Sequence, residues 1–177
     1  MTDKFSSTKF LVMCGLVLFA AFARFIPHPP NFAPIAAMAL FGGAYLSNKK
    51  LAFIVPFAAL FLSDLVIGLY EGIWVVYISF ALVVLIGMTL KNRIKIGNVA
   101  VASITASAAF FVITNFGVWA MGILYPKTAE GLIACYTAAI PFFHNTLLGD
   151  LFYTGVLFGV YEVVKVKFPV LAEAKNS

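Results

Sequence analysis

Charged side chains are scarce in this chain of 177 residues: only 11% of its residues are charged, whereas 63% are hydrophobic. A soluble domain is about one quarter charged and about half apolar. A soluble fold cannot bury so much apolar side chain, so the composition excludes a soluble class and predicts an integral membrane protein. The length favours one domain, residues 1–177. In such a protein the net charge of +5 orients the chain in the lipid bilayer and does not indicate a nucleic-acid partner.

Cysteines and sequence motifs for catalysis are also scarce. Cys14 and Cys135 are far apart and lack the spacing of a metal site, so we expect both to be small buried side chains. The sequence contains no G-x-x-x-x-G-K-[ST], no H-E-x-x-H, no G-x-S-x-G and no D-D-x-x-D-like pair. We therefore expect no ATPase or hydrolase activity, no catalytic residue, no cofactor and no metal.

Long apolar runs dominate what the chain does contain. They cover about residues 10–26, 33–46, 51–70, 73–90, 99–125 and 141–164. A membrane span needs about 20 helical residues, and backbone groups in lipid must pair within the segment. Four runs meet that length and the first is adequate, whereas residues 33–46 are short and could be half-embedded. The sequence thus predicts an all-α membrane protein with six transmembrane helices.

The positions of the basic residues predict the orientation. With six spans and both termini in the cytoplasm, ten lysines and arginines lie inside, and only Arg24 and Lys127 lie outside. We therefore expect a multi-pass protein of a bacterial inner membrane. One alternative remains, because the basic start and Ala21-Phe22-Ala23 resemble a cleavable signal peptide, which would leave five spans and an external N-terminus.

The stretch from Arg24 to Gly43 stands out because it holds four of the eight prolines. Its first half is predicted to be a stiff loop, since proline disfavours helix interiors and pushes the preceding residue toward extended geometry. We interpret it as a lid over a binding site; the alternative is a rigid turn between helices. Two further outward segments are expected: a tight turn at Glu71-Gly72 and a second lid from Pro126 to Ile140, in which Thr128 caps a short helix.

Polar residues within apolar runs are costly in a membrane and are functional candidates. In the six-span arrangement these groups fall in the outer half of the bundle. Either they contact an organic ligand, or Asp64 and Asp150 pair with Arg24 or His144, and Asn115 bonds neighbouring helices, to hold the bundle together. The G-x-x-x-G at Gly155 is expected to serve helix packing, within the chain or against another subunit. The candidate substrate-binding residues are Arg24, His28, Asn31, Asp64, Asn115, Trp119, His144, Asn145, Asp150 and Tyr153.

Several motifs carry a resemblance to a known group of proteins. R-F-I-P-H-P-P-N-F-A-P-I-A-A-M-A-L-F-G-G-A-Y, L-S-D-L-V-I-G, T-N-F-G-V-W-A, Y-P-K-T-A-E-G-L and P-F-F-H-N-T-L-L-G-D-L-F-Y together resemble an uncharacterised family of small bacterial inner-membrane proteins labelled as transport proteins. The size, the six spans and the outward loops are also similar to the S components of energy-coupling factor (ECF) vitamin transporters.

The second resemblance implies an outward-facing vitamin site closed by loops, with a transmembrane coupling subunit and ATPases acting in trans. The first apolar run lacks the A-x-x-x-A docking pair that S components often carry, so a carrier that works alone remains an alternative. Our leading hypothesis is an uptake protein that binds a small vitamin-like molecule. The alternatives are a membrane-embedded enzyme that acts on a lipid or isoprenoid with His144 and Asp150 as acid–base partners, and an accessory subunit without a ligand.

Overall fold

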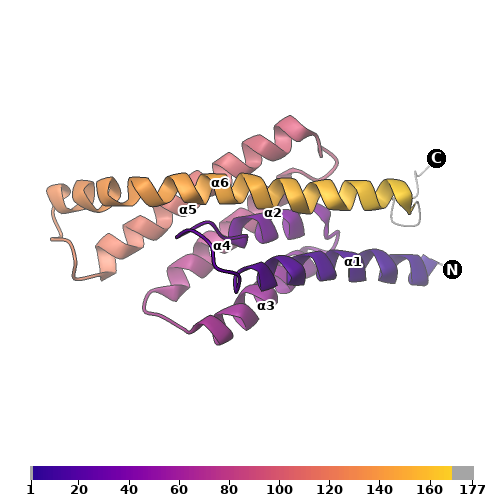
Figure 1. The fold of residues 1–177 in the computed structure, drawn as a ribbon, viewed down its shortest axis with the longest axis horizontal. Helices are drawn as coiled ribbons and strands as arrows, with labels where there is room; N and C mark the ends of the chain where they lie inside the picture. The colour runs from indigo at the N-terminus through magenta and orange to yellow at the C-terminus, as the bar shows by residue number, and fades with distance from the viewer. Residues whose placement is uncertain (1, 169–177) are drawn as a thin grey trace.

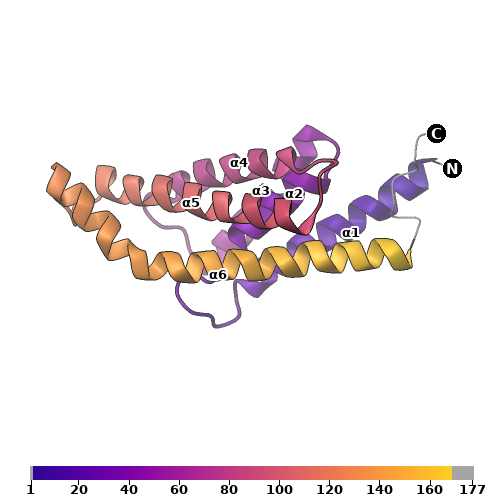
Figure 2. The same cartoon turned by 90° about the horizontal axis from the view of Figure 1, so that it is seen from above.

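The structure is a computed structural model that describes residues 2–168, with side chains described from Thr8 onward. The described residues form six α-helices and no strand, which confirms the predicted all-α class (Figure 1). The helices are α1 (Thr2–Ala23), α2 (Ile35–Tyr45), α3 (Lys49–Ile67), α4 (Ile73–Thr89), α5 (Ile96–Met121) and α6 (Ala129–Lys167). The start of α1 and the end of α6 lie at the same end of the bundle in both ribbon views (Figures 1 and 2).

Helix α2 is the centre of the bundle. It packs against each of the other five helices, and every residue from Ala36 to Ala44 is buried. Small residues permit this contact. A Cβ added at Gly43 would lie 2.2 Å from the carbonyl oxygen of Val84, and one added at Gly87 would lie 2.4 Å from that of Leu40. The backbones of α2 and α4 therefore touch where these two glycines meet.

Three of the described helices are long and apolar enough to cross a membrane, namely α3, α5 and α6. The apolar part of α1, helix α2 and helix α4 are shorter. At a rise of about 1.5 Å per residue, the 11 residues of α2 extend only about 16 Å, whereas the hydrocarbon core is about 30 Å thick. Three helices thus support the predicted membrane class. The length and composition of the other three helices do not meet the prediction of six spans.

The sixth helix corrects the prediction of a second lid. Residues 129–140 are the first part of the single 39-residue helix α6 and do not form a loop with a separate short helix. The predicted cap is present, because the Thr128 hydroxyl accepts a hydrogen bond from the backbone N–H of Gly131. Pro141 lies inside the helix and cannot donate a backbone hydrogen bond. Figure 2 shows the first part of α6 bent away from the axis of the rest.

Two other local predictions have clear outcomes. The proline-rich stretch is non-helical from Arg24 to Pro34, as predicted. The second outward turn is longer than predicted, because α3 ends at Ile67 and Gly68 and Gly72 both adopt positive φ angles, of 114° and 78°. Glycine reaches such angles without steric cost, which lets five residues reverse the chain.

The G-x-x-x-G of α6 does not serve packing within the described chain. Gly155 and Gly159 are exposed, and a Cβ added at either would meet no described atom within 4 Å. The close contact between α2 and α4 is made instead by Gly43 and Gly87, neither of which belongs to a G-x-x-x-G pair.

Candidate functional site

A cavity of about 490 Å³ lies at one end of the helix bundle. Its wall is formed by the loop after α1, the end of α3 with the turn after it, the second half of α5, the first turns of α2 and α4, and the part of α6 around Pro141. Because successive helices run in opposite directions, the end of one helix and the start of the next lie at the same end of the bundle. The lining residues are Arg24, His28, Asn31, Ala33, Ile35, Ala36, Ile67, Tyr70, Val76, Phe110, Phe111, Thr114, Asn115, Val118, Ala139, Phe142, Phe143, Thr146 and Asp150.

The proline-rich loop forms part of the cavity wall and is fixed to α6. The side-chain amide of Asn145 donates a hydrogen bond of 3.0 Å to the carbonyl oxygen of Pro30. The ring of Phe32 packs against Phe152 and Tyr153, with ring centroids 5.8 and 5.7 Å apart. A Cβ added at Gly149 would lie 3.0 Å from the Cα of Phe32, so the loop backbone rests directly on the helix.

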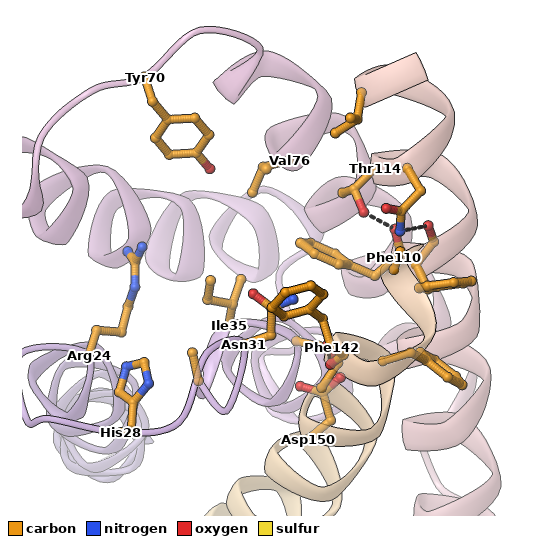
Figure 3. Close-up of a pocket in the computed structure, with 18 of the residues that line it drawn as sticks. Arg24, His28, Asn31, Ile35, Tyr70, Val76, Phe110, Thr114, Phe142 and Asp150 are labelled. Atoms are coloured by element: carbon orange, nitrogen blue, oxygen red, sulfur yellow. Dashed lines mark hydrogen bonds between the residues drawn. The ribbon is translucent and has the colours of Figure 1, made fainter. Parts of the chain in front are cut away.

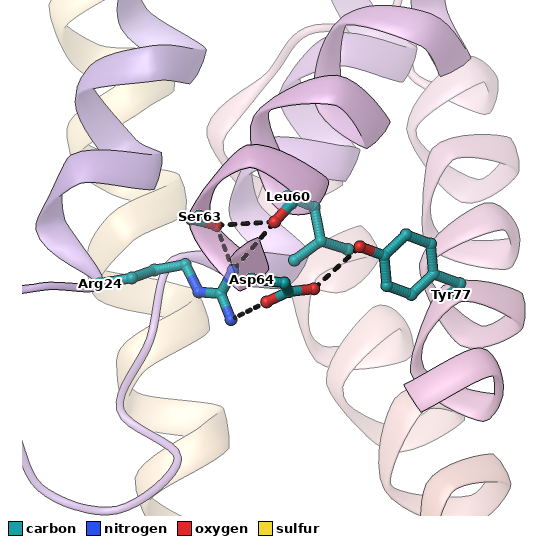
Figure 4. Close-up of polar contacts among 5 residues, drawn as sticks. All are labelled: Arg24, Leu60, Ser63, Asp64 and Tyr77. Carbon is teal, nitrogen blue, oxygen red and sulfur yellow. Dashed lines mark hydrogen bonds and ion pairs between the residues drawn. The ribbon is translucent and has the colours of Figure 1, made fainter. Parts of the chain in front are cut away.

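Arg24 reaches the cavity edge from the end of α1 and is held by α3 (Figure 4). Its Nη2 lies 2.6 Å from Oδ1 of Asp64, and its Nη1 donates to the Ser63 hydroxyl and to the carbonyl oxygen of Leu60. The other carboxylate oxygen of Asp64 accepts a hydrogen bond of 2.9 Å from the Tyr77 hydroxyl. Asp64 is 1% exposed, so this cluster satisfies a buried charge and joins α1, α3 and α4.

Asp150 supplies a buried carboxyl group to the cavity wall from α6. Its Oδ2 accepts a hydrogen bond of 2.7 Å from the Ser107 hydroxyl of α5. One turn further along, Ser103 and Thr154 place their hydroxyl oxygens 3.3 Å apart. This row of polar contacts holds α5 against α6 and fixes the carboxyl group of Asp150 at the cavity. In Figure 3, Asp150 and Phe142 lie across the cavity from Arg24 and His28.

Aromatic rings form much of the remaining wall. Phe111 and Phe143 pack with their centroids 4.7 Å apart, and Phe110 and Phe142 also line the cavity. Tyr70 closes one side from the turn after α3. Partial burial raises the pKa of the Tyr70 phenol above its ordinary value, and the Asp64 carboxylate adds to the rise, so the hydroxyl keeps its proton near neutral pH.

The ten predicted site residues divide into two groups. Five line the cavity, whereas Asp64, Trp119, His144, Asn145 and Tyr153 do not. Asp64 holds Arg24, and Asn145 and Tyr153 hold the loop, so these three support the cavity without facing it. The five predicted residues that line it are Arg24, His28, Asn31, Asn115 and Asp150.

Trp119 and His144 lie away from the cavity. The indole Nε1 of Trp119 donates a hydrogen bond of 3.0 Å to the carbonyl oxygen of Pro126, and Lys127 bonds to carbonyl oxygens at the end of α5. These contacts close the turn between α5 and α6. His144 is exposed on α6 and, unlike Asp150, does not line the cavity. The two side chains therefore do not face a common space.

Sequence reasoning missed the aromatic wall and the residues that position Asp150. Phe110, Phe142 and Tyr70 were absent from the prediction, because an aromatic residue in an apolar run looks the same whether it faces lipid, core or cavity. Ser107 could have been found, since a hydroxyl at the depth of a buried carboxyl group is a natural donor. Among the residues that the structure describes, no three His, Cys, Asp or Glu side chains gather as metal ligands.

The chain matches the model of a family of unknown function, DUF6580, over residues 4–171. No curated protein and no solved structure matches it significantly. The similarity to S components of vitamin transporters therefore stays a prediction. Because the family match covers nearly the whole chain, this protein belongs to DUF6580.

Proposed function

We propose that this protein binds a small organic molecule in the cavity and serves its uptake across a bacterial inner membrane. The observation that carries the proposal is the cavity of about 490 Å³ whose apolar, aromatic wall includes the buried carboxyl group of Asp150. Ligand pockets have volumes of about 300–1,000 Å³ and combine apolar walls with a few placed polar groups.

The proposed topology has six helices that cross or enter the membrane, with both termini in the cytoplasm. The short helix α2 fits this arrangement because it is buried among the other five and need not meet lipid along its length. The cavity then opens at the outer end. Cysteines in place of Ser47 and Lys95 should react with impermeant thiol reagents only from the cytoplasm, and one in place of Glu71 only from outside. Labelling at Lys95→Cys from outside would overturn this topology.

The lining residues indicate the chemistry of the ligand. Four phenylalanine rings favour a flat or apolar part, while Asn31, Asn115 and Thr146 offer neutral hydrogen-bonding groups. The charge of Arg24 is already paired with Asp64. Asp150, which carries no salt bridge in the described chain, favours a ligand group that donates a hydrogen bond. A vitamin-like molecule with a flat ring and polar substituents has these properties.

Mass spectrometry of small molecules that co-purify with the protein tests the proposal. A specific organic molecule, retained in near-stoichiometric amount and raising the melting temperature when added back, supports a binding protein. Turnover of an added lipid or isoprenoid would instead support an enzyme. Uptake by proteoliposomes that contain this chain alone would show a solitary carrier, and a requirement for further subunits would show a coupled, S-component-like one.

A further inference from the structure

A second hollow, of about 590 Å³, lies at the end of the bundle opposite to the cavity. We call it the inner cleft. Its walls come from the start of α1, the end of α2 with the segment after it, the turn between α4 and α5, and the last turns of α6. None of the residues that line the inner cleft lines the cavity, so the proposed uptake function does not explain the inner cleft.

Positive charge converges on the inner cleft from three separate parts of the chain. Lys9 lies on α1, Lys91 follows α4, and Lys165 lies near the end of α6. Glu162 is the one acidic residue among the described lining residues. Among the described lining residues lysines outnumber glutamate by three to one, so the inner cleft favours an anion.

Lys165 is held in place by aromatic and acidic neighbours. Its Nζ lies 2.7 Å from the Glu162 carboxylate and 5.5 Å from the ring centroids of both Tyr45 and Tyr161. The Tyr45 hydroxyl donates a hydrogen bond to the same carboxylate. The ammonium group is therefore fixed at the wall of the cleft, which lowers the entropy lost when an anion binds there.

Lys91 is also held at the wall of the cleft. Its Nζ donates a hydrogen bond of 3.2 Å to the carbonyl oxygen of Ser47, in the segment after α2. An ammonium group has three N–H donors, so this contact leaves donors for a ligand. The next residue, Asn92, adopts a positive φ of 61° and also lines the cleft. Cationic and neutral donors thus face the same hollow.

We propose that the inner cleft binds an anionic phosphate group. Lysines bind phosphate as point charges, and basic pockets between helices at the cytoplasmic face of a membrane bind the head groups of anionic lipids. The phosphate group is carried either by an anionic phospholipid of the surrounding bilayer or by a soluble phosphate compound. The described cleft residues favour a phosphate group over a carboxylate group, because several converging donors match the several oxygens of a phosphate group.

The test uses the full chain in a neutral detergent, with three probes: short-chain phosphatidylglycerol, short-chain phosphatidylcholine, and inorganic phosphate at constant ionic strength. The melting temperature is followed against probe concentration to give an apparent dissociation constant. Lys9→Gln and Lys91→Gln each remove one charge from the cleft. Lys95→Gln is the matched control, because Lys95 is an exposed residue at the same end of the bundle that does not line the cleft.

We expect a saturable rise in melting temperature with phosphatidylglycerol or with inorganic phosphate, and a much smaller one with phosphatidylcholine. A response to phosphatidylglycerol assigns the site to a lipid head group, and a response to inorganic phosphate assigns it to a soluble phosphate compound. Lys9→Gln and Lys91→Gln should each weaken binding about fivefold, Lys91→Arg should restore it, and Lys95→Gln should leave it unchanged. Equal loss in Lys95→Gln and Lys91→Gln, or no saturable response to either anionic probe, would overturn the proposal.

Discussion

The guanidinium of Arg24 and the carboxylate of Asp64 lie 2.6 Å apart, with side-chain exposures of 9% and 2%. The pair fixes the first residue of the proline-rich loop to α3. Arg24 lines the cavity, whereas Asp64 does not. Asp64 therefore holds Arg24 at the cavity without lining the cavity itself.

This relationship predicts strong coupling between the two residues. Asp64→Asn or Arg24→Gln alone leaves a buried charge without its partner, which costs about 3–5 kcal/mol. The double variant should lose much less than the sum of the two losses, because neither charge remains. Unfolding of the four proteins in the same detergent measures the coupling. Additive losses would show that the pair contributes nothing as a pair.

The contact between α2 and α4 predicts that two glycines differ sharply in their tolerance of change. Gly87→Ala places a Cβ against the Leu40 backbone, and overpacking of this kind costs about 1–3 kcal/mol. Gly155→Ala, the matched control on the exposed face of α6, should leave the free energy of unfolding unchanged or slightly raise it. Thermal unfolding of both variants checks this, and equal behaviour of the two would contradict the described helix crossing.

The hydrogen bond from Asn145 to Pro30 predicts that Asn145 acts on binding through the loop. Asn145→Ala should weaken binding of the co-purified molecule about fivefold, since a lost hydrogen bond of about 1 kcal/mol frees the loop. His144→Ala, one residue away and exposed, is the control and should bind normally. Titration calorimetry provides the measurement. If His144→Ala were the more damaging change, the enzyme hypothesis built on His144 and Asp150 would regain support.

The position of Asp150 at the cavity predicts that replacing it lowers the affinity for the ligand much more than it lowers the stability of the protein. Asp150→Asn keeps the shape of the side chain and can still accept the Ser107 hydrogen bond, so its loss of stability should be about 0.6 kcal/mol. The affinity for the bound molecule should fall tenfold or more, because the negative or acidic group facing the cavity is gone. Melting temperature and dissociation constant are measured on the same preparation. A large loss of stability with unchanged affinity would return Asp150 to a purely structural role.

The proline-rich loop and the all-α class could be predicted from the sequence, and five of the ten predicted site residues line the cavity. The reason is physical: Pro29 and Pro30 exclude helix by their own geometry, and Asp150 in an apolar run needs a polar setting. Both signals are local to the residues that carry them.

The remaining features depend on contacts that the sequence does not display. Whether Asp64 faced a ligand or Arg24 depended on the rotation of α1 against α3. The sequence does not display the length of α6, because Pro141 looks like a helix boundary although it lies within a bent helix. The buried position of α2 follows from Gly43 meeting Gly87, two residues far apart in the chain.

The central claim is that the cavity holds a small organic molecule, and filling the cavity tests it most directly. Ala139 lines the cavity, whereas its neighbour Ala138 is exposed, so Ala139→Trp and Ala138→Trp form a matched pair. Mass spectrometry measures the molecule retained per mole of protein in each variant, and melting temperature confirms folding. We predict that wild type and Ala138→Trp retain it and that a folded Ala139→Trp protein does not. Equal retention by both variants would contradict binding in this cavity.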